Sequence, residues 1–327
     1  MPTHSRRVAF GAACLLTIFV AGGLAQGQHY PSNVVRIVVP TGPGSPPDIL
    51  SRIIATDLAT SEGWRVVVDN RPGALQTIGV ADVLKQPADG HSVLAMTVPT
   101  LAAQTLLPKL GLQLETDLAP VIKFATGYNV LVVHPSVPAK SVSELIAVLK
   151  SQPDKFNFAS GGFGTPAHLI GELFKLKTGV RATHVPYPTG QQRIADLLSG
   201  ATQFSFLASS LSMELVASGK LRALAVTGPK RVDALKDVPT IVEQGFPELV
   251  VEDWVGFAAR GGTSTEILAR LNEAMNTALT RHSVREALAR SGYEPAGGTP
   301  AEFGTLIKSQ LALWGAIITD SGIKMPQ

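Results

Sequence analysis

The chain contains, in succession, VVRIVV (residues 34–39), PTGPGSPP (residues 40–47) and DILSRIIATDL (residues 48–58). The β-branched run predicts a buried strand, and the apolar spacing after the loop predicts a helix. The start of that helix leaves backbone N–H groups free, at the positive end of the helix dipole and just beyond the carboxyl end of the strand. Folds of the α/β class use this arrangement to bind an anion without a charged side chain.

The same unit occurs twice more. FNFAS (residues 156–160) leads through GGFGTP into AHLIGELFKL (residues 167–176), and ATHVPY (residues 182–187) leads through PTGQQ into RIADLLSG (residues 193–200). Three such loops predict a site for a small anion. We expect residues 40–48 and 160–165 to hold a ligand carboxylate mainly through backbone N–H groups.

Residues 1–25 are predicted to be a secretory signal peptide. Arg6 and Arg7 form a basic segment, residues 8–20 are apolar, and Ala25 ends a small-residue cleavage site. We favour the general secretory route over twin-arginine export. The only cysteine, Cys14, lies in this segment, so disulfides, thiolate nucleophiles and cysteine metal sites are excluded from the mature protein. Export and a cysteine-free body indicate the bacterial periplasm.

The composition argues against nucleic-acid binding. Apolar residues make up 45% of the chain and charged residues 16%, and the formal net charge is only +3. Lysines and arginines never cluster in more than two, so no surface is predicted to attract a polyanion. The length allows one large domain or two smaller ones.

Strand and helix patterns alternate up to residue 227, which predicts parallel sheets with helices on both faces. A second set of units begins at VLVVH (residues 130–134), and the pattern after Trp254 is mostly helical. Because a helical tail must dock on a folded body, we expect the chain to return to its first domain. Domain 1 is therefore predicted to comprise residues 26–127 and 250–327, and domain 2 residues 128–249. Two crossings, near residues 124–130 and 251–257, would form a hinge, with a ligand cleft between two α/β lobes.

Motifs for catalysis or nucleotide binding are weak. GFGTPA (residues 162–167) fits the dinucleotide pattern G-x-G-x-x-A, but the next strand ends at Tyr187 without the acidic residue that would hold a ribose. The chain has no G-x-S-x-G elbow, no H-E-x-x-H pair and no P-loop lysine. These motifs therefore give little support to catalysis or to a bound nucleotide.

Five single residues allow two interpretations each. His168 and His184 are the histidines near the anion loops, and each is either structural or a ligand contact. Asp48 is either a helix cap or a ligand contact. Arg71 either braces its loop or faces the ligand, and Trp254 either packs in the hinge or forms a wall of the cleft.

In combination, these motifs resemble the solute-binding receptors of tripartite tricarboxylate transporters, the Bug receptors. Like that family, the predicted mature chain opens with Tyr30-Pro31 before an apolar strand. The other matching motifs are PTGPGSPPD (residues 40–48), NRPG…TIG (70–79), ADG (88–90), FASGGFGT (158–165), HLIGELF (168–174), HVPY (184–187), GKLRALAVT (219–227), DVPT (237–240) and Trp254.

The resemblance implies a monomeric periplasmic receptor with the type II periplasmic-binding-protein fold. Such a receptor closes over a carboxylate and presents it to the permease subunits of a membrane transporter. The resemblance also implies no enzyme activity, no metal and no required cofactor. The candidate ligand contacts lie in the loops named above, at the loops after the next strands and at the hinge. They are Gly42, Pro43, Gly44, Ser45, Pro46, Pro47, Asp48, Gln76, Thr77, Thr97, Val98, Thr100, Ser160, Gly161, Phe163, Gly164, Thr165, His168, Thr189, Gly190, Gln191, Ser209 and Trp254.

The departures from the family pattern suggest a class of ligand. They are Ser45-Pro46-Pro47, Leu75-Gln76 in place of Gly-Gly, Phe163, Pro188, Arg193, and Leu207-Ala208 in place of Asp-Asn. Apolar and aromatic residues replace small or polar pocket edges, so we favour a carboxylate with a flat apolar body, such as terephthalate. The alternatives are an aliphatic di- or tricarboxylate, a ligand-sensing subunit for a membrane kinase, and an exported hydrolase that uses Ser45 or Ser160 with His168.

Overall fold

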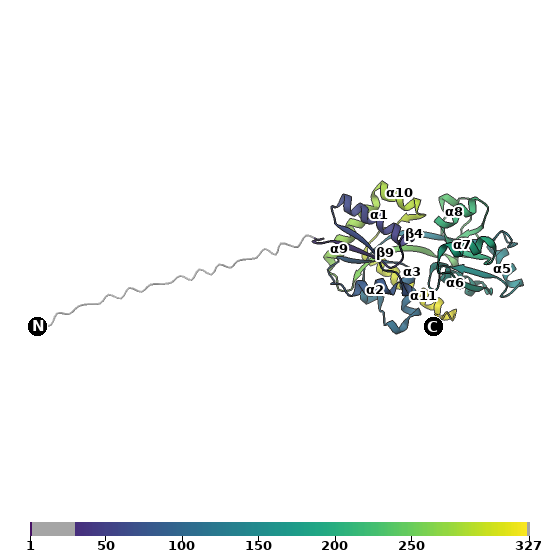
Figure 1. Ribbon diagram of the computed structural model, residues 1–327, viewed down its shortest axis with the longest axis horizontal. Helices are drawn as coiled ribbons and strands as arrows, with labels where there is room; N and C mark the ends of the chain where they lie inside the picture. The colour runs from purple at the N-terminus through teal and green to yellow at the C-terminus, as the bar shows by residue number, and fades with distance from the viewer. Residues whose placement is uncertain (2–29, 326–327) are drawn as a thin grey trace.

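The computed structural model describes Met1 and residues 30–325 (Figure 1). The predicted cleavage site, and the signal peptide apart from Met1, lie outside the described residues. None of the described helices is both long enough and apolar enough to cross a membrane.

Up to β8, strands and helices alternate along the described chain, as the sequence predicts. The strands are β1 (Val35–Val39), β2 (Val66–Asn70), β3 (Ser92–Met96), β4 (Leu118–Val133), β5 (Asn157–Ser160), β6 (Thr183–Pro186), β7 (Phe204–Ala208), β8 (Arg222–Val226), β9 (Glu252–Arg260) and β10 (Tyr293–Pro295). The α-helices are α1 (Pro46–Ser61), α2 (Thr77–Leu84), α3 (Val98–Leu106), α4 (Leu114–Asp117), α5 (Val142–Ser151), α6 (Pro166–Thr178), α7 (Gly190–Ser199), α8 (Ser209–Ala217), α9 (Thr265–Thr280), α10 (His282–Arg290) and α11 (Pro300–Asp320). A 3-10 turn, η1 (Ala74–Gln76), precedes α2.

The long strand β4 is shared by two lobes. The strand order is β2-β1-β3-β9-β4-β7-β5-β6, and β8 and β10 also pair with β4. The part of β4 up to Tyr128 pairs with β9, and the part from Asn129 pairs with β7 and β8. The lobe with α1, α2, α9 and α10 and the lobe with α5 to α8 therefore lie on either side of this crossing (Figure 1). We propose that the domain boundaries lie at the predicted positions, residues 127/128 and 249/250.

The carboxyl ends of the parallel strands point toward the crossing from both sides. In the first lobe, β3 runs antiparallel to β9 and brings Met96 opposite Gly256. In the second lobe, β7 runs antiparallel to β4 and brings Ala208 opposite Asn129. Because β1 and β2 run parallel with β3, and β5 and β6 with β7, the loops after all six strands face one another across the crossing.

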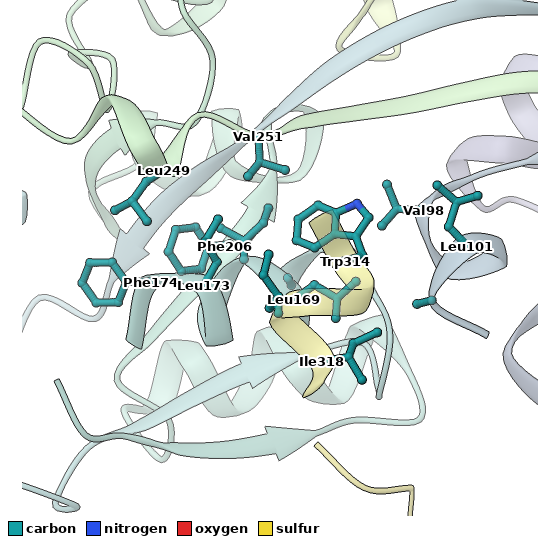
Figure 2. Packing of buried hydrophobic residues seen from close by; sticks show 14 of the residues in the cluster. Val98, Leu101, Leu169, Leu173, Phe174, Phe206, Leu249, Val251, Trp314 and Ile318 are labelled. Carbon is teal, nitrogen blue, oxygen red and sulfur yellow. The ribbon is translucent and has the colours of Figure 1, made fainter. Parts of the chain in front are cut away.

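The C-terminal helix α11 packs against both lobes. It lies against α3 of the first lobe and α6 of the second. Figure 2 shows Trp314 and Ile318 of α11 between Val98 and Leu101 on one side and Leu169 on the other. All five belong to one buried cluster. The sequence predicts that the helical tail docks on the first domain, whereas α11 stabilises the two lobes together.

Strand β9 is the largest departure from the sequence expectation. The pattern after Trp254 looks helical, yet β9 continues to Arg260 and is the main partner of β4. Small residues with low strand propensity hide this strand, and Gly256 is required because the ring of Phe303 packs directly against it. Helix α8 and strand β10 also had no clear signal in the sequence.

Candidate functional site

The loops after β1, β2 and β3 face the loops after β5, β6 and β7 across the crossing. One contact between the lobes is at Gly164, where a β-carbon would lie 3.2 Å from Leu106 Cδ1, 3.3 Å from Leu75 Cδ2 and 3.5 Å from Ala102 Cβ. Leu75, Ala102 and Leu106 belong to the first lobe and Gly164 to the second. The two lobes are therefore in van der Waals contact beside the candidate site.

Asp48 braces the loop after β1. Its carboxylate accepts hydrogen bonds from the Gly44 N–H at 2.9 Å, from Arg52 Nε at 3.0 Å and from Asn70 Nδ2 at 2.9 Å. Burial alone would raise the pKa of Asp48, but these three hydrogen bonds outweigh burial and lower the pKa. Helix α1 begins at Pro46, so Asp48 lies in its first turn and Ser45 occupies the cap position.

The same loop offers few free N–H groups to an anion. Pro43, Pro46 and Pro47 have no N–H. The N–H of Gly44 is bonded to Asp48, and that of Ser45 points to the Gly42 carbonyl at 3.3 Å. The expectation that this loop holds a carboxylate mainly through its backbone is therefore weakened.

The loop after β5 also satisfies most of its own donors. The Gly162 N–H donates to Ser160 Oγ at 3.0 Å, and the Gly164 N–H donates to His168 Nδ1 at 3.1 Å. The Thr165 N–H points to the Gly162 carbonyl at 3.4 Å. Gly161 is exposed at the tip of this loop.

His168 and His184 form a stacked, uncharged pair. Their ring centroids are 4.0 Å apart with an interplanar angle of 22°. Burial, with contributions from His184 and Lys175, lowers the pKa of His168 to about 3. Burial and the nearby Lys175 lower the pKa of His184 to about 4. At neutral pH both rings are neutral, so they position the loop and do not attract an anion by charge.

The arrangement does not form a hydrolase site. Ser160 contacts His184 Nε2 at 2.6 Å, and it is His184, not His168, that lies beside this serine. Ser160 is fully buried, and its Oγ also lies 3.0 Å from the Gly162 carbonyl oxygen. Among the described residues, no carboxylate hydrogen-bonds to His184 to orient it as a base.

Phe163 packs edge-on against the histidine pair. Its ring centroid lies 5.3 Å from that of His168 and 5.2 Å from that of His184, with interplanar angles of 77° and 88°. The side chain is only partly buried. Its orientation is thus fixed by the protein while part of its surface remains available.

The turn after β2 has a left-handed backbone. Ala74, Leu75 and Gln76 have φ values of +45°, +52° and +71°. Such angles are uncommon for residues other than glycine, and they concentrate at functional sites. The buried Gln76 is held there because its Oε1 accepts from Thr97 Oγ1 at 2.9 Å and from Thr100 Oγ1 at 2.6 Å.

Arg193 lies in the first turn of α7, beside the loop after β5. Its Nη1 is 3.8 Å from the position of a β-carbon on Gly161. The residue is 9% exposed, and burial lowers the pKa of its guanidinium. In the sequence, Arg193 stands out only as a departure from the family pattern. The available signal was its place at a helix start, where a cation opposes the helix dipole.

Two more side-chain donors near the crossing are buried without a hydrogen bond. They are Nδ2 of Asn129 and Nε1 of Trp254. Asn129 lies where β4 changes partners, and Trp254 pairs with Thr126 of the same strand. Buried donors without acceptors are uncommon in folded proteins, and an acceptor-rich ligand or its ordered water would satisfy them.

The remaining candidates divide by environment. Val98 and Trp254 belong to the buried core, and the Trp254 ring packs edge-on against Phe303 at 5.4 Å. Thr77 Oγ1 donates to the Ala74 carbonyl, and Ser209 Oγ donates to the Gly292 carbonyl of the first lobe at 3.1 Å. The exposed candidates in the second lobe are Gly161, Thr189, Gly190 and Gln191.

Arg71 braces its own loop. Its Nε donates to Asp69 Oδ2 at 3.0 Å, and half of the side chain is exposed. Among the described residues, no group of three or more metal-ligating side chains is arranged to hold a metal ion.

Comparison with known proteins gives consistent matches over most of the chain. The family model for the tripartite tricarboxylate transporter family receptor matches residues 50–323. BugT of Bordetella pertussis is 33% identical over 317 residues, which are 95% of this chain and 97% of BugT.

Two solved structures combine a similar fold with a bound dicarboxylate. Rpa4515 of R. palustris with adipate has a TM-score of 0.80 and 34% identity, over 90% of this chain and 99% of that one. MatC of Rhodopseudomonas palustris with bound malate has a TM-score of 0.77 and 27% identity, over 88% and 100% of the two chains.

Proposed function

Because this chain belongs to the tripartite tricarboxylate transporter receptor family, we propose that it captures a dicarboxylate between its two lobes and delivers it to the permease of such a transporter. Receptors of this family are periplasmic binding proteins and not enzymes. The observation that carries the proposal is that six strand-end loops face one another across the crossing of β4 and β9.

The polar groups around the crossing support an anionic ligand. The buried groups that lack a partner there are donors, namely Asn129 Nδ2, Trp254 Nε1 and Arg193 Nε. A carboxylate carries only acceptors when it is ionised, so it complements such a set. Adipate and malate, which the two similar receptors bind, are both dicarboxylates.

We favour an aromatic body for the ligand, such as that of terephthalate. Phe163 is held edge-on by two neutral histidines and is partly exposed. Leu75 replaces a glycine of the family pattern and lies at the contact between the lobes. Flat apolar surfaces of this kind suit an aromatic ring, while the ligands of the similar receptors favour an aliphatic dicarboxylate as the second candidate.

A thermal-shift screen of mono-, di- and tricarboxylates on the purified mature protein tests the proposal. A ligand at 100 times its dissociation constant adds about 2.7 kcal/mol to the free energy of unfolding. We expect dicarboxylates to give the largest shifts, with the protein monomeric throughout. If no carboxylate raises the melting temperature and calorimetry also detects no binding, the proposed function is wrong.

A receptor that reports its ligand to a membrane kinase would use the same closure. Deleting the permease genes separates the two roles. We expect the deletion to abolish uptake of the ligand by the cell, and an unchanged uptake would exclude the transport role.

A further inference from the structure

Among the residues that the structure describes, none pairs with the guanidinium of Arg193, although the residue is almost completely enclosed. It is 9% exposed, and its Nε is buried without a hydrogen bond. Within residues 30–325, no carboxylate lies within ion-pair distance of it. A buried arginine without an anion is unusual, because removal of a charge from water is costly unless the charge is paired.

The acidic residue one turn further along the helix is not available as a partner. Asp196 accepts a hydrogen bond from the Tyr187 hydroxyl at 2.7 Å. The N–H of Arg193 itself points to the Thr189 carbonyl, and the Thr189 hydroxyl caps the helix by accepting from the Gln192 N–H. The start of α7 therefore holds its own cap and places a guanidinium where the helix dipole is already positive.

The guanidinium lies at the strand-end loops. Its Nη1 is 3.8 Å from the β-carbon position of Gly161, which is exposed at the tip of the loop after β5. Gly161 lacks a side chain, so no side chain at this position covers the guanidinium. The first N–H groups of α7, at Gly190 and Gln191, lie on the same side of the lobe as the carboxyl ends of β5 and β6.

We propose that Arg193 is a specificity-determining residue that pairs with one carboxylate of the ligand and so selects dicarboxylates over monocarboxylates. This inference rests on the proposed function, and it names the group that distinguishes this receptor's ligands. A guanidinium presents two parallel N–H donors that match the two oxygens of a carboxylate. The second carboxylate then lies toward the first lobe, and a ligand without the carboxylate at Arg193 leaves the arginine unpaired.

Calorimetric titration of matched ligand pairs tests this assignment. The pairs are terephthalate with benzoate and adipate with hexanoate, and the variants are Arg193→Gln and Arg193→Lys. Arg181→Gln is the control, since Arg181 lies in the same lobe, is exposed and pairs with Asp154 at the surface.

In whichever ligand pair the wild-type protein binds, we expect it to bind the dicarboxylate more tightly than the monocarboxylate. Arg193→Gln should weaken that dicarboxylate about 100-fold and the monocarboxylate less than about threefold, so that the preference is lost. Arg193→Lys should recover part of the affinity, because it keeps the charge but not the planar fork. Arg181→Gln should leave both affinities unchanged.

Thermal unfolding without ligand separates a binding role from a structural one. Arg193→Gln removes an unpaired buried charge, so the melting temperature of the free protein should stay the same or rise while the ligand-induced shift shrinks. The assignment would be overturned if Arg193→Gln lowered the melting temperature of the free protein and reduced the affinities for both ligands of a pair equally. If the wild type binds a dicarboxylate and Arg193→Gln binds it equally well, only this inference is refuted. If the wild type binds neither pair nor any other carboxylate, the proposed function is refuted as well.

Discussion

Gly164, in the loop after β5, lies directly against Leu75, in the turn after β2, and at this point the two lobes touch. The Leu75 Cδ2 atom is 3.3 Å from the position of a β-carbon on Gly164. Both residues have left-handed backbones, with φ of +70° at Gly164 and +52° at Leu75. For the leucine this conformation costs about 1–2 kcal/mol, so the rest of the site must hold the turn in place.

Gly164→Ala should therefore weaken ligand binding by keeping the lobes apart. The added methyl group would meet Leu106, Leu75 and Ala102 of the other lobe, and we expect an affinity loss of about tenfold or more by calorimetry. Gly179→Ala is the matched control, because Gly179 has φ of +68° and nothing within 4 Å of the added methyl. Both variants carry the same backbone strain of about 1 kcal/mol. Equal affinities in the two variants would show that the contact has no part in binding.

Phe163→Ala distinguishes an aromatic from an aliphatic ligand. An aromatic contact contributes about 0.5–1.5 kcal/mol beyond the buried area, so we expect an aromatic dicarboxylate to lose more than about tenfold in affinity. A short aliphatic dicarboxylate should change little. Calorimetric titration with both ligands gives the comparison. Similar losses for the two would mean that Phe163 only shapes the loop through His168 and His184, and the aliphatic candidate would then be preferred.

The neutral histidine pair predicts acid sensitivity of the fold. Since the pKa of His168 is about 3 in the folded protein and about 6.5 in an unfolded chain, protons bind the unfolded state preferentially between these values. The contribution of His168 to the free energy of unfolding should be nearly constant above pH 6.5. It should fall as the pH drops, by about 2 kcal/mol at pH 5. His184, with its pKa lowered to about 4, acts in the same direction.

Urea unfolding of the wild type and of His168→Asn at pH 7 and pH 5 checks this dependence. The asparagine amide oxygen can still accept from the Gly164 N–H, but it does not titrate. We expect the loss of stability between the two pH values to be smaller in the variant by about 2 kcal/mol. Identical pH dependence in the two proteins would contradict the assignment of a neutral buried His168.

Asp48→Asn should loosen the loop after β1. The carboxylate accepts hydrogen bonds from Gly44, Arg52 and Asn70. Because the variant loses the charge that strengthens these bonds, we expect its free energy of unfolding to fall by about 1.5–3 kcal/mol. Asp154→Asn is the control, because its pair with Arg181 is exposed at the surface and should contribute less than about 1 kcal/mol. Chemical denaturation measures both. A loss at Asp48 no larger than at Asp154 would mean that the loop does not depend on this residue.

Much of the fold follows from local pattern. The run at residues 34–58 forms β1, the loop and α1 as predicted, because strand and helix periodicities there depend only on neighbouring residues. The repeats at residues 156–176 and 182–200 form β5–α6 and β6–α7 for the same reason. Strand β9 escaped prediction because its Gly256 reads as a strand breaker, whereas packing against Phe303, distant in the sequence, requires a glycine there.

The site was harder to predict because tertiary hydrogen bonds decide which donors remain free. The helix starts indicate available N–H groups, but the Gly164 N–H is used by His168 and the Gly44 N–H by Asp48. Nothing in the local sequence shows that Arg193 is buried without an acidic partner, or that Asp196 accepts a hydrogen bond from Tyr187 instead. Predicting these pairings needs the three-dimensional arrangement of the loops.

A crystal structure of the mature protein with the dicarboxylate that stabilises it most tests the central claim directly. We expect one ligand molecule between the loops after β1 to β3 and those after β5 to β7, with one carboxylate within hydrogen-bond distance of the Arg193 guanidinium. A ligand bound outside these loops, for instance in the surface groove between α1 and α10, would contradict the account.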